Sequence, residues 1–202
     1  MTAVDETARE PGGARHAAID PEIANRVKLV CFDVDGVLTD GGIYLGDVAG
    51  RRLEFKRYDI QDGLGIKLLQ RAGIEVAIMT GRVSESVALR ARELGIADVV
   101  QDEHARKLPA LQHMLARKHL HASQVAFVGD DLPDLAVLRV VGLPVVVANG
   151  SVDAVHAARL RLTRQGGRGA VREFCEMLLR ARGEWDALVE WYVQSRMEDT
   201  AR

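Results

Sequence analysis

Two aspartates separated by one residue, Asp33 and Asp35, are the first side chains whose types and spacing suggest chemistry. They follow an apolar run, Leu29 to Phe32, which is typical of a strand buried on both faces. Both carboxylates would then lie just past the carboxyl end of that strand, where open parallel sheets bind ligands. Two acids so close repel each other unless a cation joins them, so the pair indicates a hard metal such as Mg²⁺. On this segment alone, a strand followed by an ordinary Asp-Gly turn is an equally good interpretation.

Further polar side chains, at the ends of later predicted strands or at the start of a predicted helix, favour the chemical interpretation. They are Thr80, Lys107, Asp130, Asp131 and Asp134. A carboxylate can attack phosphorus and form an aspartyl-phosphate. A second acid two residues on can protonate the leaving oxygen and later activate water. Phosphoryl transfer otherwise needs a metal, a lysine and hydroxyl or amide donors, and the sequence supplies each of them.

The elements that must position these groups alternate along the chain. Helical patterns are predicted at residues 62–73, 84–95, 106–119, 135–141 and 152–158. Strand patterns lie between and after them, at residues 74–79, 98–101, 124–128, 143–148 and 161–163. The alternation predicts an α/β fold, a doubly wound, Rossmann-like parallel sheet built from right-handed βαβ units. A β-hairpin between residues 43 and 58 is the one insertion, directly after the first strand, so we expect no cap domain.

Length and composition limit the remaining possibilities. The 202 residues, 48% of them hydrophobic, fit one domain at residues 27–182 with flanking tails. We expect residues 1–26 to be a disordered N-terminal tail and residues 183–202 to be a C-terminal helix or tail. In that last segment Trp185, Trp191 and Tyr192 are expected to pack against the body. The net charge of -2 gives no reason to expect a nucleic-acid partner.

Two further absences bear on where the protein works. No stretch approaches the roughly 20 apolar residues of a membrane span, so we expect no membrane partner. The chain has only two cysteines, Cys31 and Cys175, which lie far apart and suit a reducing compartment. A cytoplasmic location is therefore predicted.

Four motifs in order resemble those of the haloacid dehalogenase superfamily of phosphatases. The first is Asp33-Val-Asp-Gly-Val-Leu-Thr39, and Thr80, Lys107 and Gly129-Asp-Asp-Leu-Pro-Asp134 match the second, third and fourth. Any one of them is weak evidence, whereas four in the expected order are specific. Across residues 27–182 the chain is similar to the capless branch of this superfamily. That narrower likeness is carried by Thr39-Asp-Gly-Gly, Gln61-Asp-Gly-Leu-Gly-Ile-Lys-Leu-Leu69, Met79-Thr-Gly-Arg82 and Gly166-Gly-Arg-Gly-Ala-Val-Arg-Glu173.

The resemblance implies an Mg²⁺-dependent phosphatase and a role for each matching residue. Asp33 would be the nucleophile and a metal ligand, and Asp35 the general acid/base, whose backbone carbonyl also binds Mg²⁺. Asp130 would be the third protein ligand. Thr80 and Lys107 would bind and neutralise the phosphoryl oxygens. The substrate-binding residues that the resemblance implies are Asp62, Gly81, Arg82, Arg168 and Arg172.

The resemblance also implies a substrate and an assembly. The first candidate substrate is 3-deoxy-D-manno-octulosonate 8-phosphate (KDO 8-phosphate), a small anionic sugar phosphate used in lipopolysaccharide precursor synthesis. The alternatives are another acid sugar phosphate, such as a nonulosonate 9-phosphate, and an inactive binding or regulatory module. The implied assembly is a homotetramer with the hairpin at its interface, in which residues 166–173 help to close a neighbouring subunit's site. Residues 166–169 alone could also be a flexible linker.

Overall fold

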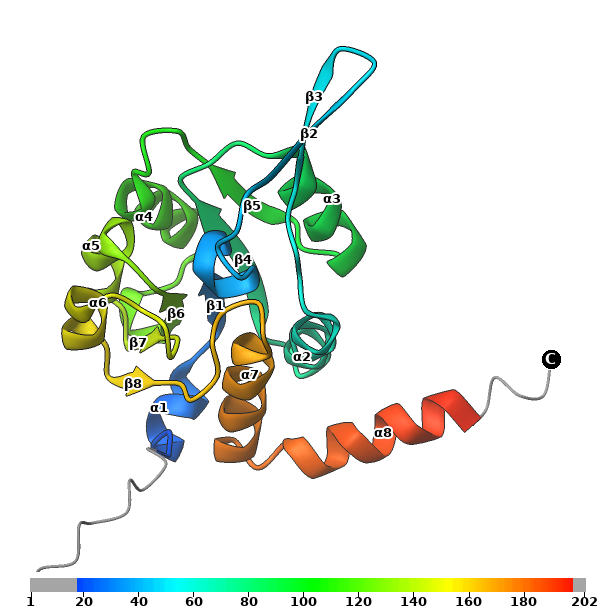
Figure 1. The fold of residues 1–202 in the computed structure, drawn as a ribbon. Helices are drawn as coiled ribbons and strands as arrows, with labels where there is room; N and C mark the ends of the chain where they lie inside the picture. Colours follow the sequence, from blue (N-terminus) through cyan, green and yellow to red (C-terminus); the bar gives the residue numbers. More distant parts are fainter. Residues whose placement is uncertain (1–17, 198–202) are drawn as a thin grey trace, which may run out of the picture.

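Six parallel strands form the centre of the structure, a computed structural model that describes residues 18–197 apart from the side chains of Val48, Arg51 and Arg52 (Figure 1). The strand order is β5-β4-β1-β6-β7-β8, and every neighbouring pair is parallel. The bounds are β1 Leu29–Phe32, β4 Glu75–Thr80, β5 Asp98–Gln101, β6 Val125–Gly129, β7 Leu143–Val146 and β8 Leu160–Arg161. The predicted doubly wound, Rossmann-like sheet is confirmed.

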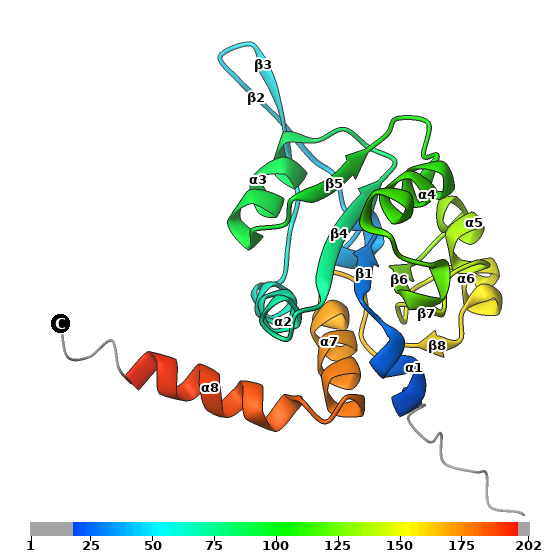
Figure 2. The same cartoon turned by 180° about the vertical axis from the view of Figure 1, so that it is seen from behind.

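Helices cover both faces of this sheet, as Figure 1 and the opposite view in Figure 2 show. In β1, Val30 and Phe32 pack into one apolar cluster and Leu29 and Cys31 into the other, since successive side chains of a strand point to opposite faces. The first cluster is completed by α1 Pro21–Arg26, α2 Ile60–Arg71, α3 Glu85–Leu94 and α7 Ala170–Ala181. The second is completed by α4 Lys107–Lys118, α5 Leu135–Leu138 and α6 Val152–Ala157. The strand is therefore buried on both sides, as its apolar run predicts.

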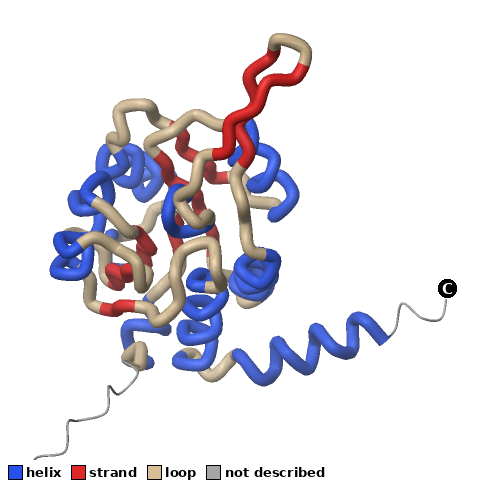
Figure 3. The backbone as a smooth tube through the Cα atoms, in the orientation of Figure 1, coloured by secondary structure: helices blue, strands red, loops and turns tan. Residues whose placement is uncertain are grey.

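The predicted hairpin is present and stands outside the main sheet (Figure 3). Strands β2 Tyr44–Val48 and β3 Arg51–Phe55 pair antiparallel as a sheet of their own. Ala49 and Gly50, both with positive φ, form the tight turn between them. Leu45 is 78% exposed, and Tyr44 and Phe55 are also exposed, so in the single chain the hairpin presents apolar side chains to solvent.

The N-terminal segment needs a correction. Helix α1 lies within the predicted disordered tail, and its N-cap residue Asp20 accepts a hydrogen bond from the backbone of Glu22 at 2.8 Å. Ile23 and Ala24 are buried in the cluster that α7 completes. The prediction of a tail through residue 26 is therefore wrong for residues 20–26, because an amphipathic turn finds an apolar partner far along the chain. Residues 1–17 lie outside the described residues.

The C-terminal segment has two parts. Helix α7 is core, since Phe174 is fully buried and packs edge-on against Phe32 at a ring-centroid distance of 6.2 Å. Helix α8, Trp185–Met197, begins with a buried Trp185 and then runs out from the body (Figure 1). Trp191 is 39% exposed and lies under the guanidinium of Arg71 at 4.4 Å. None of the described helices is long and apolar enough to cross a membrane.

Candidate active site

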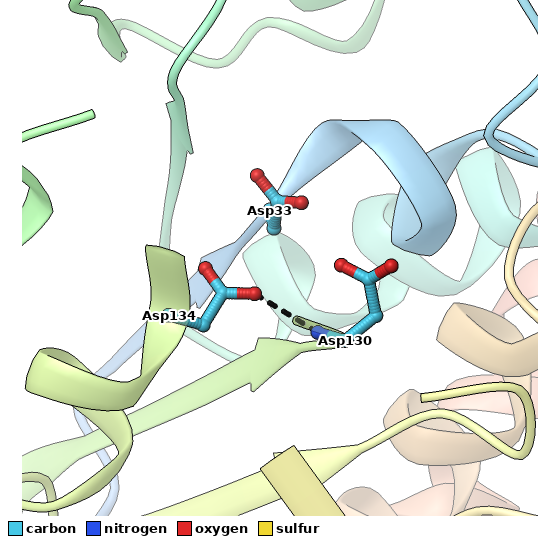
Figure 4. A group of neighbouring side chains, drawn as sticks. All are labelled: Asp33, Asp130 and Asp134. Carbon is cyan, nitrogen blue, oxygen red and sulfur yellow. Dashed lines mark hydrogen bonds between the residues drawn. The ribbon is translucent and has the colours of Figure 1, made fainter. Parts of the chain in front are cut away.

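The strand order places the candidate site at the carboxyl ends of β1, β4 and β6. From β1 the chain moves outward through β4 to β5, then returns to the other side of β1 as β6. Such a reversal of direction opens a crevice between the two central strands. Asp33 follows β1, Thr80 ends β4 and Asp130 follows β6. Three of the predicted site residues are therefore brought together by topology, and Figure 4 shows two of them, Asp33 and Asp130, with the neighbouring Asp134.

A tight turn after β1 lets two of the acids approach each other. Residues 34–38 form a single helical turn, interrupted by Gly36 at φ 92°. A Cβ at Gly36 would lie 2.0 Å from a carboxylate oxygen of Asp130, and its φ of 92° is strained for other residue types, so glycine is strongly favoured here. The hydroxyl of Thr39 donates to the carbonyl of Val34 at 3.1 Å and closes the turn. The glycine in this turn thus leaves room for the Asp130 carboxylate.

A buried lysine joins the acids. The Lys107 ammonium donates to Asp33 Oδ1 at 2.5 Å and to Asp134 Oδ1 at 2.6 Å. The other oxygen of Asp134 accepts the backbone N–H of Asp130 at 2.9 Å. Burial lowers the pKa of Lys107, but the charges of Asp33 and Asp134 outweigh it and raise that pKa above its ordinary value. Lys107 is therefore a fixed positive charge directly behind the nucleophile position.

The acid cluster fits a hard divalent cation. Asp33, Asp130 and Asp134 each offer one oxygen, and these oxygens lie within 4.8 Å of one another. Burial raises the pKa of Asp33, and burial together with the charge of Asp33 raises the pKa of Asp130. The single positive charge of Lys107 is therefore too little to neutralise the carboxylates of this cluster. Both oxygens of Asp134 already accept hydrogen bonds, which leaves Asp33 and Asp130 as the carboxylates free to bind metal. Oxygen ligands of this kind suit Mg²⁺.

The cleft in front of these acids has a volume of about 250 Å³. Its lining includes seven of the predicted site residues, namely Asp33, Asp35, Thr80, Gly81, Arg82, Lys107 and Asp130. A Cβ at Gly81 would lie 2.8 Å from that of Ala105, so this glycine lets the segment leading to Lys107 pack tightly against the end of β4. The arrangement offers a nucleophilic carboxylate, a second acid, a fixed cation and a hydroxyl around one small space.

Comparisons with known proteins agree with this geometry. A sequence profile of haloacid dehalogenase-like hydrolases matches residues 58–142. The 3-deoxy-D-manno-octulosonate 8-phosphate phosphatase KdsC of Escherichia coli K12 is 41% identical over 163 residues, which is 81% of this chain and 85% of that protein. The chain belongs to the KdsC family of haloacid dehalogenase-like hydrolases.

Solved structures support the same family. The 3-deoxy-D-manno-octulosonate 8-phosphate phosphatase of Moraxella catarrhalis, in complex with magnesium ion, phosphate ion and KDO, superposes with a TM-score of 0.80 at 40% identity. That match covers 85% of this chain and 97% of the other. The cobalt-bound phosphatase of Haemophilus influenzae gives a TM-score of 0.75 at 35% identity, covering 81% of this chain and 93% of the other.

Three predicted substrate-binding residues of this KdsC family member lie outside the cleft. Asp62 is buried and accepts the backbone N–H of Arg172 at 2.7 Å, so it ties the start of α2 to the start of α7. The guanidinium of Arg172 lies over the ring of Trp185 at 5.1 Å and does not line the cleft. Arg168 is exposed on the loop before α7. Asp62 and Arg172 therefore make structural contacts within this chain, and their predicted contact with substrate stays a prediction.

The glycine-rich loop before α7 packs against the catalytic turn. The N–H of Gly167 donates to the carbonyl of Val37 at 2.9 Å, within the same chain. A Cβ at Gly166 would lie 1.7 Å from the carbonyl oxygen of Gly36. The loop therefore has a defined position on the catalytic turn of its own chain and is not a flexible linker. Its contact with a neighbouring subunit stays a prediction.

Sequence reasoning missed two residues of the site. Lys56, just after β3, donates to Asp35 Oδ1, and its side chain is 0% exposed. Glu54, on β3, accepts a hydrogen bond from Arg82 at 2.8 Å. The sequence does contain a pattern that could have indicated them, since Glu54 and Lys56 alternate with the apolar Leu53 and Phe55. Alternate residues of an extended chain point to the same face, so both charges would lie together.

Proposed function

We propose that this KdsC family member is an Mg²⁺-dependent phosphoric monoester hydrolase that converts KDO 8-phosphate to KDO and phosphate. The observation that carries the proposal is the buried group at the end of β1. There Asp33 is held by Lys107, faces Asp130, and is followed two residues later by Asp35. The relatives named for this reaction supply the substrate.

The chain's own side chains account for both half-reactions. One oxygen of Asp33 attacks phosphorus, the bond from phosphorus to the sugar oxygen breaks, and its electron pair stays on that oxygen, which takes a proton from Asp35. Asp35, now ionised, removes a proton from a water molecule whose oxygen attacks the same phosphorus. The bond to Asp33 then breaks and phosphate leaves. One ester and one water molecule give one sugar and one phosphate, with both side chains restored.

The remaining groups neutralise and orient the phosphoryl group. Lys107 lies within hydrogen-bond distance of Asp33, where it offsets the negative charge that accumulates on transfer. The Thr80 hydroxyl, buried at the end of β4, is placed to donate to a phosphoryl oxygen. Asp33, Asp130 and the backbone carbonyl of Asp35 would hold Mg²⁺, which supplies positive charge for the phosphoryl oxygens.

Selection of an acid sugar is assigned to arginines at the cleft mouth. The Arg82 side chain lines the cleft and is 46% exposed, so it can present a guanidinium to a substrate carboxylate. Arg168 is a second exposed candidate, on the loop packed against the catalytic turn. A nonulosonate 9-phosphate carries the same carboxylate and is the alternative substrate. An inactive binding module is disfavoured because every group required for phosphoryl transfer is present.

The assembly and location belong to the same proposal. The exposed apolar side chains of the hairpin, including Leu45 and Phe55, would be buried in a homotetramer with the hairpin at the interface. The enzyme would act in the cytoplasm, in lipopolysaccharide precursor synthesis. Light scattering tests the assembly, and a fully active monomer at assay concentration would contradict it.

A phosphate-release assay over acid sugar phosphates tests the activity. With Mg²⁺, we expect the highest kcat/KM on KDO 8-phosphate and a lower value on a nonulosonate 9-phosphate. The matched control is Asp33→Asn, nearly isosteric but a poor nucleophile, which should fold like the wild type and release no phosphate. A preference for the nonulosonate would change the substrate, whereas activity of Asp33→Asn would refute the chemistry.

A further inference from the structure

The second arm of the hairpin contacts the active site through two charged residues. Glu54, on β3, and Lys56, just after its end, are two residues apart, and both contact cleft residues. The Lys56 ammonium donates to Asp35 Oδ1 and lies 3.2 Å from Glu54 Oε1. This places a fully buried lysine directly against the acid that the reaction uses to protonate the leaving oxygen.

The contacts close into a ring of four charges. Glu54 Oε2 accepts from Arg82 at 2.8 Å, and Arg82 Nε lies 3.6 Å from Asp35 Oδ2. Asp35 Oδ2 is a buried atom without a hydrogen-bond partner in the described part of the chain, so the nearby guanidinium is its compensating charge. Two cations and two carboxylates alternate around the ring, and each cation faces both acids. Removal of any member leaves its neighbours with uncompensated charge.

The local backbone explains why Asp35 needs this support. Asp35 itself is non-helical at φ -76° and ψ 109°, and the next residue, Gly36, is at φ 92°. No regular helix or strand fixes the direction of its side chain. Asp33, by contrast, directly follows β1 and has its own lysine, Lys107. Each of the two reacting carboxylates is thus held by a separate buried lysine.

We propose that Glu54 and Lys56 are positioning residues that hold Asp35 in the orientation needed for proton transfer to the leaving oxygen. The inference rests on the proposed function, since it takes from there the role of Asp35. Lys56 contacts Asp35 directly, and Glu54 acts by orienting Lys56 and Arg82. Neither residue lines the cleft in which the phosphoryl group would bind. The hairpin is therefore part of the catalytic apparatus as well as a candidate interface.

The leaving group distinguishes positioning of an acid from general support of the fold. An alkyl phosphate such as KDO 8-phosphate needs a proton on its leaving oxygen, whereas p-nitrophenyl phosphate releases a stable phenolate without one. Rapid-quench measurement of the first turnover isolates this step from the later hydrolysis. We expect Lys56→Met to slow the first turnover of the alkyl ester by about 10²-fold, a cost that a misplacement of about 1 Å can reach. The first turnover of the aryl ester and the KM of both esters should change little.

Two controls and a double mutant complete the experiment. Lys67→Met, at an exposed position of α2, should behave like the wild type on both esters. In an Asp35→Asn background, Lys56→Met should add no further loss, because the two residues act through one carboxylate. If Lys56→Met shows no cooperative melting, Glu54→Gln, which keeps the side-chain volume, takes its place. This variant should also slow the first turnover of the alkyl ester more than that of the aryl ester, by a smaller factor.

The outcomes separate this inference from the proposed function. Equal losses on the alkyl and aryl esters, or losses that add fully to those of Asp35→Asn, would overturn the positioning role while the enzyme remained a phosphatase. A wild type that hydrolyses another acid sugar phosphate in place of KDO 8-phosphate changes the substrate alone, and the comparison is then made with that ester. A wild type inactive on every ester would overturn both.

Discussion

Gly166→Ala tests the tight contact between the glycine-rich loop and the catalytic turn. The added Cβ would lie 1.7 Å from the carbonyl oxygen of Gly36 and 2.9 Å from the backbone nitrogen of Val37. Both are backbone atoms, so no rotamer change can relieve the overlap. Carbon and carbonyl oxygen approach to about 3.3 Å at the closest in proteins, so the two segments must separate by about 1.6 Å. Gly36 directly follows Asp35, so the displacement acts on the general acid/base.

The size of the effect follows from that displacement. A shift of about 1 Å at a catalytic group costs about 10²-fold in rate, so we expect kcat on KDO 8-phosphate to fall by at least that factor. Overpacking a well-packed site also costs about 1–3 kcal/mol of unfolding free energy, which lowers the Tm of a chain of this size by several degrees.

The assay is phosphate release with Mg²⁺, paired with thermal unfolding. Gly73→Ala is the matched control, because Gly73 has φ 77° but nothing within 4 Å of its added Cβ. It should lose about 1 kcal/mol from backbone strain and keep its activity. Wild-type kcat and Tm for Gly166→Ala would show that the loop can move freely, and the reasoning about the catalytic turn would then be refuted.

Three further predictions concern the buried charges. Lys107→Met leaves Asp33 and Asp134 buried without their cation, so turnover should be lost and urea denaturation should show about 3–5 kcal/mol less stability; unchanged stability would contradict the buried pair. Burial raises the pKa of Asp62 from 3.8 to about 6, so the folded state binds the proton more tightly than the unfolded state does. The unfolding free energy of the wild type should therefore fall as pH rises from about 4 to about 6, and Asp62→Asn should remove this fall. The same dependence of unfolding free energy on pH in both proteins would contradict it. Mg²⁺ should raise the Tm by relieving repulsion between Asp33 and Asp130, and Asp130→Asn should abolish most of that shift in calorimetry; an undiminished shift would place the ion elsewhere.

The parts of the site that were predictable from sequence are those set by topology. An apolar run followed by Asp33 identifies both a buried strand and the group at its end, because parallel strands present their carboxyl ends at one edge. The same reasoning places Thr80 and Asp130, and glycine-terminated helical patterns predict the connections. Local patterns were therefore sufficient for the sheet and for the acid cluster.

Contacts between distant segments could not be read in this way. Asp62 looks like an exposed acid in the first turn of a helix, but α7 places a backbone N–H over it from 110 residues away. Gly166 has the composition of a flexible loop, whereas its lack of a side chain serves close approach to Gly36. In the sequence Lys56 is indistinguishable from a solvated hairpin lysine, whereas in the structure its side chain is buried against Asp35 of the catalytic turn. Each of these three contacts depends on which distant segment the fold packs against the residue. The spacing of residues along the chain does not contain that information.

The same limit explains the misplaced boundary of the N-terminal tail. Residues 20–26 are too short to form a stable helix alone. Helix α1 is ordered because Ile23 and Ala24 find an apolar surface to which α7 contributes. Its N-cap, Asp20, is visible in the sequence, but a cap becomes informative only once a buried face is known.

Trapping the covalent intermediate tests the central claim most directly. Wild-type enzyme, Mg²⁺ and KDO 8-phosphate are mixed, quenched with acid during turnover and digested, and the peptides are examined by mass spectrometry. We predict one phosphate on the peptide that contains Asp33. Borohydride should reduce this aspartyl-phosphate to homoserine at position 33, and Asp33→Asn should form no such adduct. Steady release of phosphate from KDO 8-phosphate with no adduct at Asp33, or with an adduct on another residue, would contradict the account.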